Sequence, residues 1–389
     1  MTPEQIRKAI PTVRTAKGLM YLLNNVKRDI YGGTCYPFNM KDIFYYCNPS
    51  RSDKAYKHFK IAKKLGGFRE ISAPTRNLKQ IQACLNVIFQ ALYEPTNIAK
   101  GFLPHKSVVD NAAAHIGAKY VFNTDIKDFF PSITQARVWA VLQLPPLNFT
   151  REAASLIAGF CCMQVPNPNA TGSRDKYRYI LPQGSPCSPI LTNLVCSKLD
   201  RRLNGLAKRF DLNCTRYADD ITFSSSHNIY SKDGEFFKEL KRIIEGQGFR
   251  INEGKTRLQN KSMRQEVTGV TVNEKMNVSR KFVREVQSIL FIWERYGYGT
   301  AMTRFGQHYA VNKPNKMVKG QDYLIRVIQG KLMYMKMIKG ESDPTYRKLL
   351  SRFHRLTNKG DRGTSSKIKW NCELPLFDAA PSNWTANDY

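Results

Sequence analysis

The sequence is short of acidic residues. Its 389 residues include 61 lysines and arginines but only 31 aspartates and glutamates, which gives a formal net charge of +30. Charge of one sign repels itself in a compact chain, so an excess of this size indicates a large polyanionic partner. Nucleic acid and an anionic membrane surface are the two partners to which such a charge is attracted.

Long apolar runs are also missing. No stretch of the chain approaches the roughly 18 consecutive apolar residues of a membrane-spanning helix. The first residues lack the apolar core of a signal peptide. We therefore expect no membrane partner, and nucleic acid becomes the expected polyanion.

Closely spaced cysteine pairs are absent as well. The nine cysteines are scattered, without the two-residue spacing that is typical of zinc sites. An odd number of cysteines without a secretion signal fits reduced thiols, so we expect a cytoplasmic protein. The hydrophobic content of 42% is enough for a sizeable core, which we expect to be divided among two or three subdomains.

Two adjacent acids, Asp219 and Asp220, stand at the centre of an alternating segment. Residues 211–216 and 221–224 alternate as the arms of a β-hairpin do, which puts the acids at its tip. Two unit charges about 4 Å apart repel by about 4 kcal/mol at an effective dielectric of about 20, so the pair needs a counter-charge such as a divalent metal. Taken alone, adjacent aspartates in a turn are as often simple turn formers.

A third acid, Asp125, ends a separate apolar run. Residues 120–126 have strand character, and Ser132 and Gln135 have the spacing of a helix capping box. The segment therefore predicts a strand, an acid, a turn and a helix. Oxygen ligands from two segments are what a pair of Mg²⁺ ions about 3.5–4 Å apart needs for phosphoryl transfer.

The aspartate segments belong to an ordered series of motifs. In chain order the series covers residues 63–74, 101–107, 125–132, 181–186, 217–220 (Tyr-Ala-Asp-Asp) and 248–256. These motifs resemble the catalytic segments of reverse transcriptases. Two further signatures, Asn111 to His115 and Val267-Thr268-Gly269, resemble those of bacterial retron reverse transcriptases. The resemblance implies an α+β right-hand polymerase with fingers, a ferredoxin-like palm and a helical thumb.

The resemblance also implies limits for these subdomains. They are N-terminal helices and fingers at 1–110, a palm at 111–275 with an inserted fingers segment at about 132–180, a basic thumb at 276–372 and an acidic tail at 373–389. Aromatic residues are interleaved with the basic residues of the thumb, which suits RNA binding.

Roles for individual residues follow from the same resemblance. Asp125, Asp219 and Asp220 would hold two Mg²⁺ ions with the backbone of Ile126, and Lys255 would protonate the departing pyrophosphate. The incoming dNTP would contact Arg69, Lys63 or Lys64, Phe130, Gln183 and Gly184. RNA would contact Asn111, His115, Val267, Thr268 and Gly269. A surface lysine is the plain alternative for Lys255, and a histidine such as His115, taken alone, is more often structural.

The resemblance extends to biology. It implies copying of part of a cognate noncoding RNA into multicopy single-stranded DNA, primed from a guanosine 2′-hydroxyl and therefore branched. The bacterial cytoplasm and a role in anti-phage defence beside an effector protein are implied too. The alternatives are a reverse transcriptase of another bacterial class, intron-like or defence-associated, and a noncatalytic RNA-binding scaffold.

Overall fold

The protein is described from a computed structural model of residues 1–389. The described residues are 1–63, 66–173, 175–231, 233–306 and 323–358, so Lys64 and the expected acidic tail at 373–389 lie outside them. Within this part, the chain divides into two compact units, one of residues 1–106 and 122–258 and one of residues 107–121 and 259–358. No helix in these ranges combines the length and the apolar character needed to cross a membrane.

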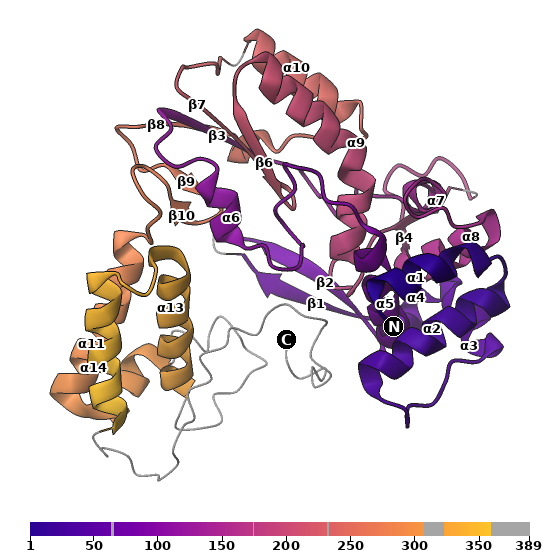
Figure 1. Ribbon diagram of the computed structural model, residues 1–389, viewed down its shortest axis with the longest axis horizontal. Helices are drawn as coiled ribbons and strands as arrows, with labels where there is room; N and C mark the ends of the chain where they lie inside the picture. The colour runs from indigo at the N-terminus through magenta and orange to yellow at the C-terminus, as the bar shows by residue number, and fades with distance from the viewer. Residues whose placement is uncertain (64–65, 174, 232, 307–322, 359–389) are drawn as a thin grey trace. The chain divides into compact units, whose positions relative to one another are not determined.

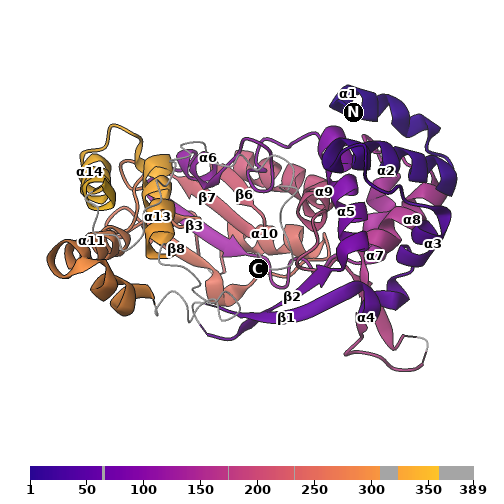
Figure 2. The same ribbon diagram turned by 90° about the horizontal axis from the view of Figure 1, so that it is seen from below.

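Helices make up the N-terminal part of the first unit. They are α1 (Pro3–Ala9), α2 (Ala16–Tyr31), α3 (Met40–Tyr46), α4 (Ser52–Ala55) and α5 (Arg76–Leu92), with the 3₁₀ turns η1 (Ile10–Thr12) and η2 (Pro49–Arg51). α5 packs against α1, α2 and α8 (Arg151–Cys161), as Figure 2 shows. Its apolar stripe from Leu78 to Leu92 is buried, because apolar residues three and four positions apart share one helix face.

A β-hairpin lies between α4 and α5. β1 (Tyr56–Ala62) and β2 (Phe68–Pro74) pair antiparallel, with Tyr56 opposite Pro74 and Ala62 opposite Phe68. The amide of Lys63 donates to the carbonyl of Gly67, which closes the tip. Most of the motif at 63–74 therefore lies on the second strand of a β-hairpin.

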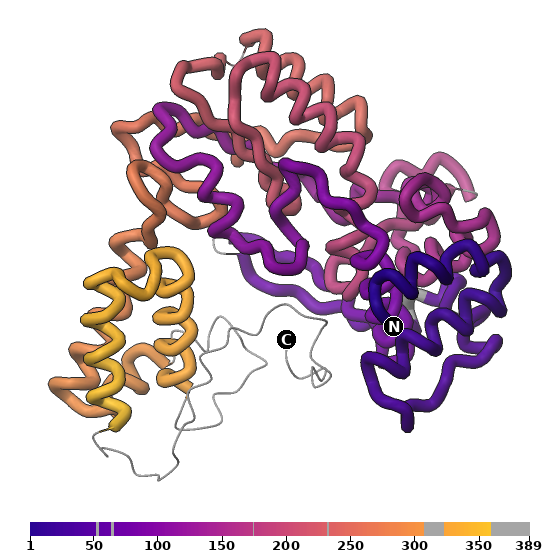
Figure 3. The backbone as a smooth tube through the Cα atoms, viewed as in Figure 1, coloured from indigo at the N-terminus to yellow at the C-terminus, as the bar shows by residue number. Residues whose placement is uncertain are grey.

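A four-stranded sheet forms the centre of the first unit (Figure 1). Its strands are β3 (Tyr120–Asp125), β6 (Asn213–Tyr217), β7 (Asp220–Ser225) and β8 (Arg257–Asn260), in the order β6-β7-β3-β8. α9 (Ser188–Arg209) precedes β6, and α10 (Glu235–Glu245) lies between β7 and β8. This β-α-β-β-α-β order, with the first and third strands in the middle, is the predicted ferredoxin-like topology. Figure 3 traces how β3 lies among strands that come much later in the chain.

The segment between β3 and α9 holds further elements. They are α7 (Gln135–Leu142), α8 and the hairpin of β4 (Met163–Pro166) with β5 (Tyr177–Ile180). The N-cap of α7 is Thr134, whose hydroxyl accepts from the amide of Arg137. Ser132, the predicted cap, instead donates to the carbonyl of Phe129 at 2.6 Å, so that part of the prediction is wrong.

The second unit combines a small β-turn region with long helices. Its elements are α6 (Val108–Ala113), β9 (Glu266–Val267), β10 (Val270–Thr271), α11 (Arg280–Ala301), the π-helical turn η4 (Met302–Gly306), α13 (Tyr323–Lys339) and α14 (Pro344–Asn358). Val121 and Val267 share one apolar core with Leu290, Leu332 and Phe353. Within the described residues this unit takes in 107–121 and the described part of 259–358, and the palm limits at 111 and 275 stay a prediction.

Candidate active site

The tip of the β6–β7 hairpin carries both adjacent aspartates. Tyr217 pairs with Asp220, so the turn consists of Ala218 and Asp219, as the alternating pattern predicts. Ala218 has a φ of 58°, and this positive φ at the first turn position alone is the φ pattern of a type II′ turn. Glycine is usual there, so the turn is held in a conformation that alanine rarely adopts.

Asp125, at the end of β3, is brought to this turn by backbone hydrogen bonds. The amide of Ile126 donates to the carbonyl of Asp219 at 2.9 Å. On the other side, the amide of Asn252 donates to the carbonyl of Asp125 at 2.8 Å. The three aspartates, which come from two separate segments of the sequence, therefore lie together.

The charges of the three acids act on one another. Burial, followed by the nearby Asp125, raises the pKa of Asp219. Burial, followed by Asp219 and Asp125, raises the pKa of Asp220 to about 7. Arg69 and Lys255 oppose the rise in the pKa of Asp219, which places both cations near the turn. Cations therefore favour the ionised form of this cluster.

Lys255 lies directly at the first of these acids. Its Nζ is 2.8 Å from Oδ2 of Asp125, and Nδ2 of Asn252 donates to Oδ1 at 3.1 Å. The Lys255 side chain is 57% exposed, whereas that of Asp125 is 16% exposed. No role was predicted for Asn252, because an asparagine after a short apolar run carries no signal of its own.

The β1–β2 hairpin and its tip carry Arg69 and Lys63, two of the cations predicted to bind phosphate. Arg69 is exposed on β2, opposite Ile61, and lies close enough to Asp219 to lower its pKa. Lys63 is exposed at the hairpin tip. An exposed guanidinium beside a carboxylate cluster suits the binding of a triphosphate that arrives with divalent cations.

The loop of Gln183 and Gly184 is fixed against the same hairpin. The amide of Ser72 on β2 donates to the Gln183 carbonyl at 2.8 Å. Gly184 has a φ of 126°, and a Cβ there would lie 2.8 Å from Cγ2 of Ile71 and 2.9 Å from the Ser72 carbonyl. The glycine is therefore required by its contact with β2, whereas the sequence indicated close approach to a ligand.

A buried glutamine anchors the base of this loop. Nε2 of Gln82 on α5 donates to the hydroxyl of Tyr56 at 2.9 Å and to the carbonyl of Phe160 at 2.8 Å. Its Oε1 accepts from the hydroxyl of Ser185 at 2.7 Å. The loop is thereby tied to β1, α5 and α8, which gives Gln183 a rigid support.

Phe130 stands in a row of aromatic rings next to the aspartate turn. Its ring centroid is 5.6 Å from that of Phe129 and 6.2 Å from that of Phe102. Phe102 in turn lies 6.5 Å from the ring of Tyr217. Phe129 is a core residue, as expected, while Phe130 is half-buried beside the turn.

The second unit joins the two signatures predicted to contact RNA. Nδ2 of Asn111 donates to the hydroxyl of Thr268 at 3.3 Å, and Thr268 and Gly269 form the turn between β9 and β10. Asn111 and His115 are each 1% exposed, and Val267 is fully buried. Burial favours a role in holding this turn, and the contact with RNA stays a prediction.

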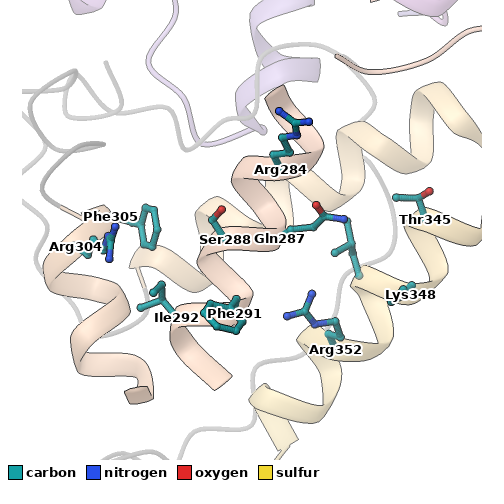
Figure 4. A pocket seen from close by; sticks show the side chains of 11 residues that line it. Arg284, Gln287, Ser288, Phe291, Ile292, Arg304, Phe305, Thr345, Lys348 and Arg352 are labelled. Atoms are coloured by element: carbon teal, nitrogen blue, oxygen red, sulfur yellow. The ribbon is translucent and has the colours of Figure 1, made fainter. Parts of the chain in front are cut away.

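A basic pocket of about 500 Å³ opens on the helices of the second unit (Figure 4). Arg284 and Phe291 come from α11, Arg304 from η4, and Lys348 and Arg352 from α14. Oε2 of Glu294 accepts from Arg352 at 2.6 Å. The ring of Phe291 is 52% exposed at the pocket wall, so a flat apolar surface stands among cations.

Comparison with known proteins decides the family. Residues 61–272 match the family model described as reverse transcriptase (RNA-dependent DNA polymerase). The chain belongs to the reverse transcriptase family. The right-hand polymerase fold and RNA-directed DNA polymerase activity are those of this family, as the motifs predict.

Two relatives place this reverse transcriptase with the bacterial retron enzymes. It is 35% identical over 243 residues to the retron Ec86 reverse transcriptase of Escherichia coli, covering 61% of this chain and 69% of the relative. It is 37% identical over 234 residues to the retron Mx162 reverse transcriptase of Myxococcus xanthus, covering 56% of this chain and 47% of the relative. A solved structure of telomerase from Candida albicans with a fragment of telomeric RNA aligns with a TM-score of 0.40 and 11% identity, over 77% of this chain and 63% of that one.

Reverse transcriptases generally use divalent metal ions. Among the described residues, no three or more His, Cys, Asp or Glu side chains form, as they stand, a group that could hold a metal ion. The cluster of Asp125, Asp219 and Asp220 nevertheless fits such ions in its chemistry, because it offers only oxygen donors, and burial followed by mutual repulsion raises the pKa of two of its members.

Proposed function

We propose that this reverse transcriptase copies part of a cognate noncoding RNA into multicopy single-stranded DNA, using two Mg²⁺ ions held by Asp125, Asp219 and Asp220. The observation that carries the proposal is the gathering of three mutually repelling carboxylates at one hairpin turn. Bound there, the ions would activate the primer hydroxyl and neutralise the triphosphate. The Ile126 backbone adjoins Asp219 and is proposed as a further oxygen ligand.

The chain's own groups would hold and orient the dNTP. Arg69 and Lys63 on the fingers hairpin would bind phosphate oxygens, and Gln183 would contact the nucleotide from its anchored loop beside Gly184. The half-buried ring of Phe130 would stand against the sugar, where a ribose 2′-hydroxyl collides with it. Lys255, exposed beside Asp125, would donate a proton to the departing pyrophosphate.

The remaining partners in the proposal are nucleic acid and protein. The helices and hairpin of the first unit would act as fingers, its four-stranded sheet as palm, and α11, α13 and α14 as thumb. The basic pocket with its exposed Phe291 supports RNA binding by the thumb, since cations and an aromatic face suit phosphate and base. We further propose a branched product, priming from a guanosine 2′-hydroxyl, and work in anti-phage defence beside an effector protein.

The test of the chemistry is primer extension on an RNA template. Wild type should incorporate dNTPs only with Mg²⁺, and Asp219→Asn or Asp125→Asn should lower the rate about a thousandfold or more, since each removes one ligand charge from the ions. A variant that keeps synthesising DNA at the wild-type rate contradicts the metal-site proposal.

The test of the product is the nucleic acid that co-purifies with the protein. A retron product should be cut by both RNase and DNase, and a debranching enzyme should separate its RNA from its DNA. Linear DNA would instead indicate a reverse transcriptase of another bacterial class, and RNA without DNA would indicate a binding scaffold.

A further inference from the structure

Arg216 is a fully buried cation directly behind the aspartate turn. It lies on β6, immediately before Tyr217, and its side chain and that of Asp200 on α9 are both 0% exposed. Nε and Nη2 of Arg216 donate to the two carboxylate oxygens of Asp200 at 2.5 and 2.8 Å. The hydroxyl of Thr96 also donates to Asp200, at 2.9 Å. A buried bidentate pair of this kind fixes the guanidinium in one orientation.

The fixed guanidinium also binds the turn itself. Nη1 of Arg216 donates to the carbonyl of Ala218 at 3.0 Å. Ala218 is the residue with the disfavoured φ of 58°, and such a conformation persists only where the surroundings hold it. The peptide that Arg216 holds is the one that leads into Asp219, so the direction of that peptide sets where the next two carboxylates point.

A second contact closes the turn from the other side. A Cβ on Gly101 would lie only 2.7 Å from the amide nitrogen of Ala218, so the backbones touch there. The carbonyl of Gly101 accepts from Nδ2 of Asn193 at 2.9 Å, and Oδ1 of Asn193 accepts from Nη2 of Arg216 at 3.1 Å. Asn193 therefore links the Gly101 backbone, which touches the turn, to the Arg216 guanidinium, which holds the Ala218 carbonyl.

This arrangement does more than neutralise a buried charge. Asn193 and Asp200 lie seven residues apart on α9 and so share one helix face. A buried ion pair by itself adds little stability over well-packed apolar residues. Here the guanidinium also donates to the carbonyl of Ala218 in the turn and to Asn193, which contacts Gly101. The same side chain therefore forms the ion pair and holds the backbone of the turn.

We propose that Arg216, Asp200 and Asn193 form a positioning network that orients Asp219 and Asp220 for metal binding. The inference rests on the proposed role of these aspartates. The network touches neither substrate nor metal, and it acts by holding the Ala218 peptide. It therefore governs the rate of the chemical step and the Mg²⁺ requirement, whereas dNTP binding depends on the separate groups of the fingers hairpin.

Asn193→Ala tests the network with the smallest change. It removes the bridge between Arg216 and Gly101 while leaving the pair of Arg216 with Asp200. Thr192→Val is the matched control, because Thr192 is equally buried on α9 and donates only to the carbonyl of Pro189. All variants are compared by primer extension at a temperature at which circular dichroism shows them folded.

Asn193→Ala should lower kcat about tenfold to a hundredfold and raise the Mg²⁺ concentration for half-maximal rate severalfold, since a displacement of about 1 Å costs that much. The KM for dNTP should stay within about twofold of wild type, because Arg69 and Gln183 are untouched. Thr192→Val should match wild type in kcat, in the Mg²⁺ concentration for half-maximal rate and in the KM for dNTP. Equal losses in both variants would overturn the proposal, because a general packing defect would then explain them.

Arg216→Lys is the second variant. A lysine can keep an ion pair with Asp200 but has no planar fork to reach Asn193 and the Ala218 carbonyl as well, so the same kinetic pattern is expected. Asp219→Asn is measured in parallel. If Asp219→Asn is inactive while Asn193→Ala and Arg216→Lys both keep the wild-type kcat and Mg²⁺ requirement, the positioning network is wrong and the proposed function stands. If Asp219→Asn is fully active, the proposed function fails first.

Discussion

At the scale of single residues, Asp220 shows how closely placed buried carboxylates lower stability when no cation neutralises them. Its pKa is raised to about 7 by burial and then by the other two aspartates. A carboxyl group whose pKa is higher in the folded state contributes stability below its unfolded pKa of about 4, and this contribution is lost as the pH rises through 7. At pH 8 the ionised Asp220 should therefore lower the free energy of unfolding of the metal-free protein.

Asp220→Asn should remove this loss of stability, because asparagine carries no charge. We expect the melting temperature in EDTA at pH 8 to rise by roughly 2–4 °C over wild type, and the difference to vanish near pH 4, where both side chains are uncharged. Thermal denaturation followed by circular dichroism measures both values. Added Mg²⁺ should raise the melting temperature of wild type more than that of the variant; a variant that melts lower than wild type in EDTA at pH 8 contradicts the argument.

Lys255 allows a second prediction at this scale. Lys255→Ala should slow the single-turnover rate of nucleotide addition about a hundredfold, because general acid catalysis contributes on that order. Lys238→Ala, which removes another exposed lysine of the same unit, is the control. An unchanged chemical step in Lys255→Ala would leave Lys255 as a partner of Asp125 only.

At the scale of elements, the contact between the Gln183 loop and β2 should be sensitive to one methyl group. In Gly184→Ala, the new Cβ meets the Ser72 carbonyl at 2.9 Å, and the φ of 126° is strained for alanine. The loop should shift away from the hairpin, and the KM for dNTP should rise severalfold in steady-state kinetics.

A glycine on α9 offers the control for this change. A methyl group added at Gly205 would meet no atom within 4 Å, so Gly205→Ala should be tolerated and should stabilise the helix by about 0.5–1 kcal/mol. An unchanged KM in Gly184→Ala would show that the loop can move without affecting the nucleotide.

The sequence predicted the elements whose signals are local. Alternation around Asp219 indicated the hairpin, and the run before Asp125 indicated β3. It did not predict Arg216, since an arginine in an alternating strand is ordinarily solvent-facing. Its burial depends on Asp200, whose pairing is a tertiary contact that no local pattern records.

The lack of a local signal for tertiary contacts also applies to Gly184 and to the pair of Asn111 and His115. The contact of Gly184 with β2 could not be predicted, because that strand lies more than a hundred residues earlier in the chain. Asn111 and His115 are both buried, and α6 ends at Ala113 before His115, which their spacing did not indicate. The contact with RNA that the resemblance implies stays a prediction. The sequence thus showed which motifs these residues belong to and in what order. Which residues surround them depends on tertiary contacts, which only the structure shows.

At the scale of the whole molecule, the net charge of +30 should control RNA affinity. Binding releases counterions from phosphates, so raising the salt concentration from 50 to 200 mM should weaken RNA binding by about a thousandfold or more. Replacing Arg284 and Lys348 of the basic pocket by alanine should reduce the slope of log affinity against log salt by roughly one to two. Fluorescence anisotropy with the cognate RNA measures both.

Lys241→Ala is the control for the pocket variants, because Nζ of Lys241 already lies near Glu245 and Glu253, at 3.9 and 3.8 Å. Its salt slope should match wild type. A pocket double variant with the wild-type slope would show that Arg284 and Lys348 do not touch phosphate.

The way the second unit is assembled limits how this enzyme can be recombined with its relatives. Residues 107–121 leave the first unit, join residues 259–358 and return, and Ala112 and Val121 are buried in the same core as Val270 and Leu324. Truncation after residue 258 would therefore strip partners from a segment that remains, exposing apolar side chains. A chimera meant to exchange RNA specificity must carry both stretches from one parent, so this unit is inherited as a discontinuous module.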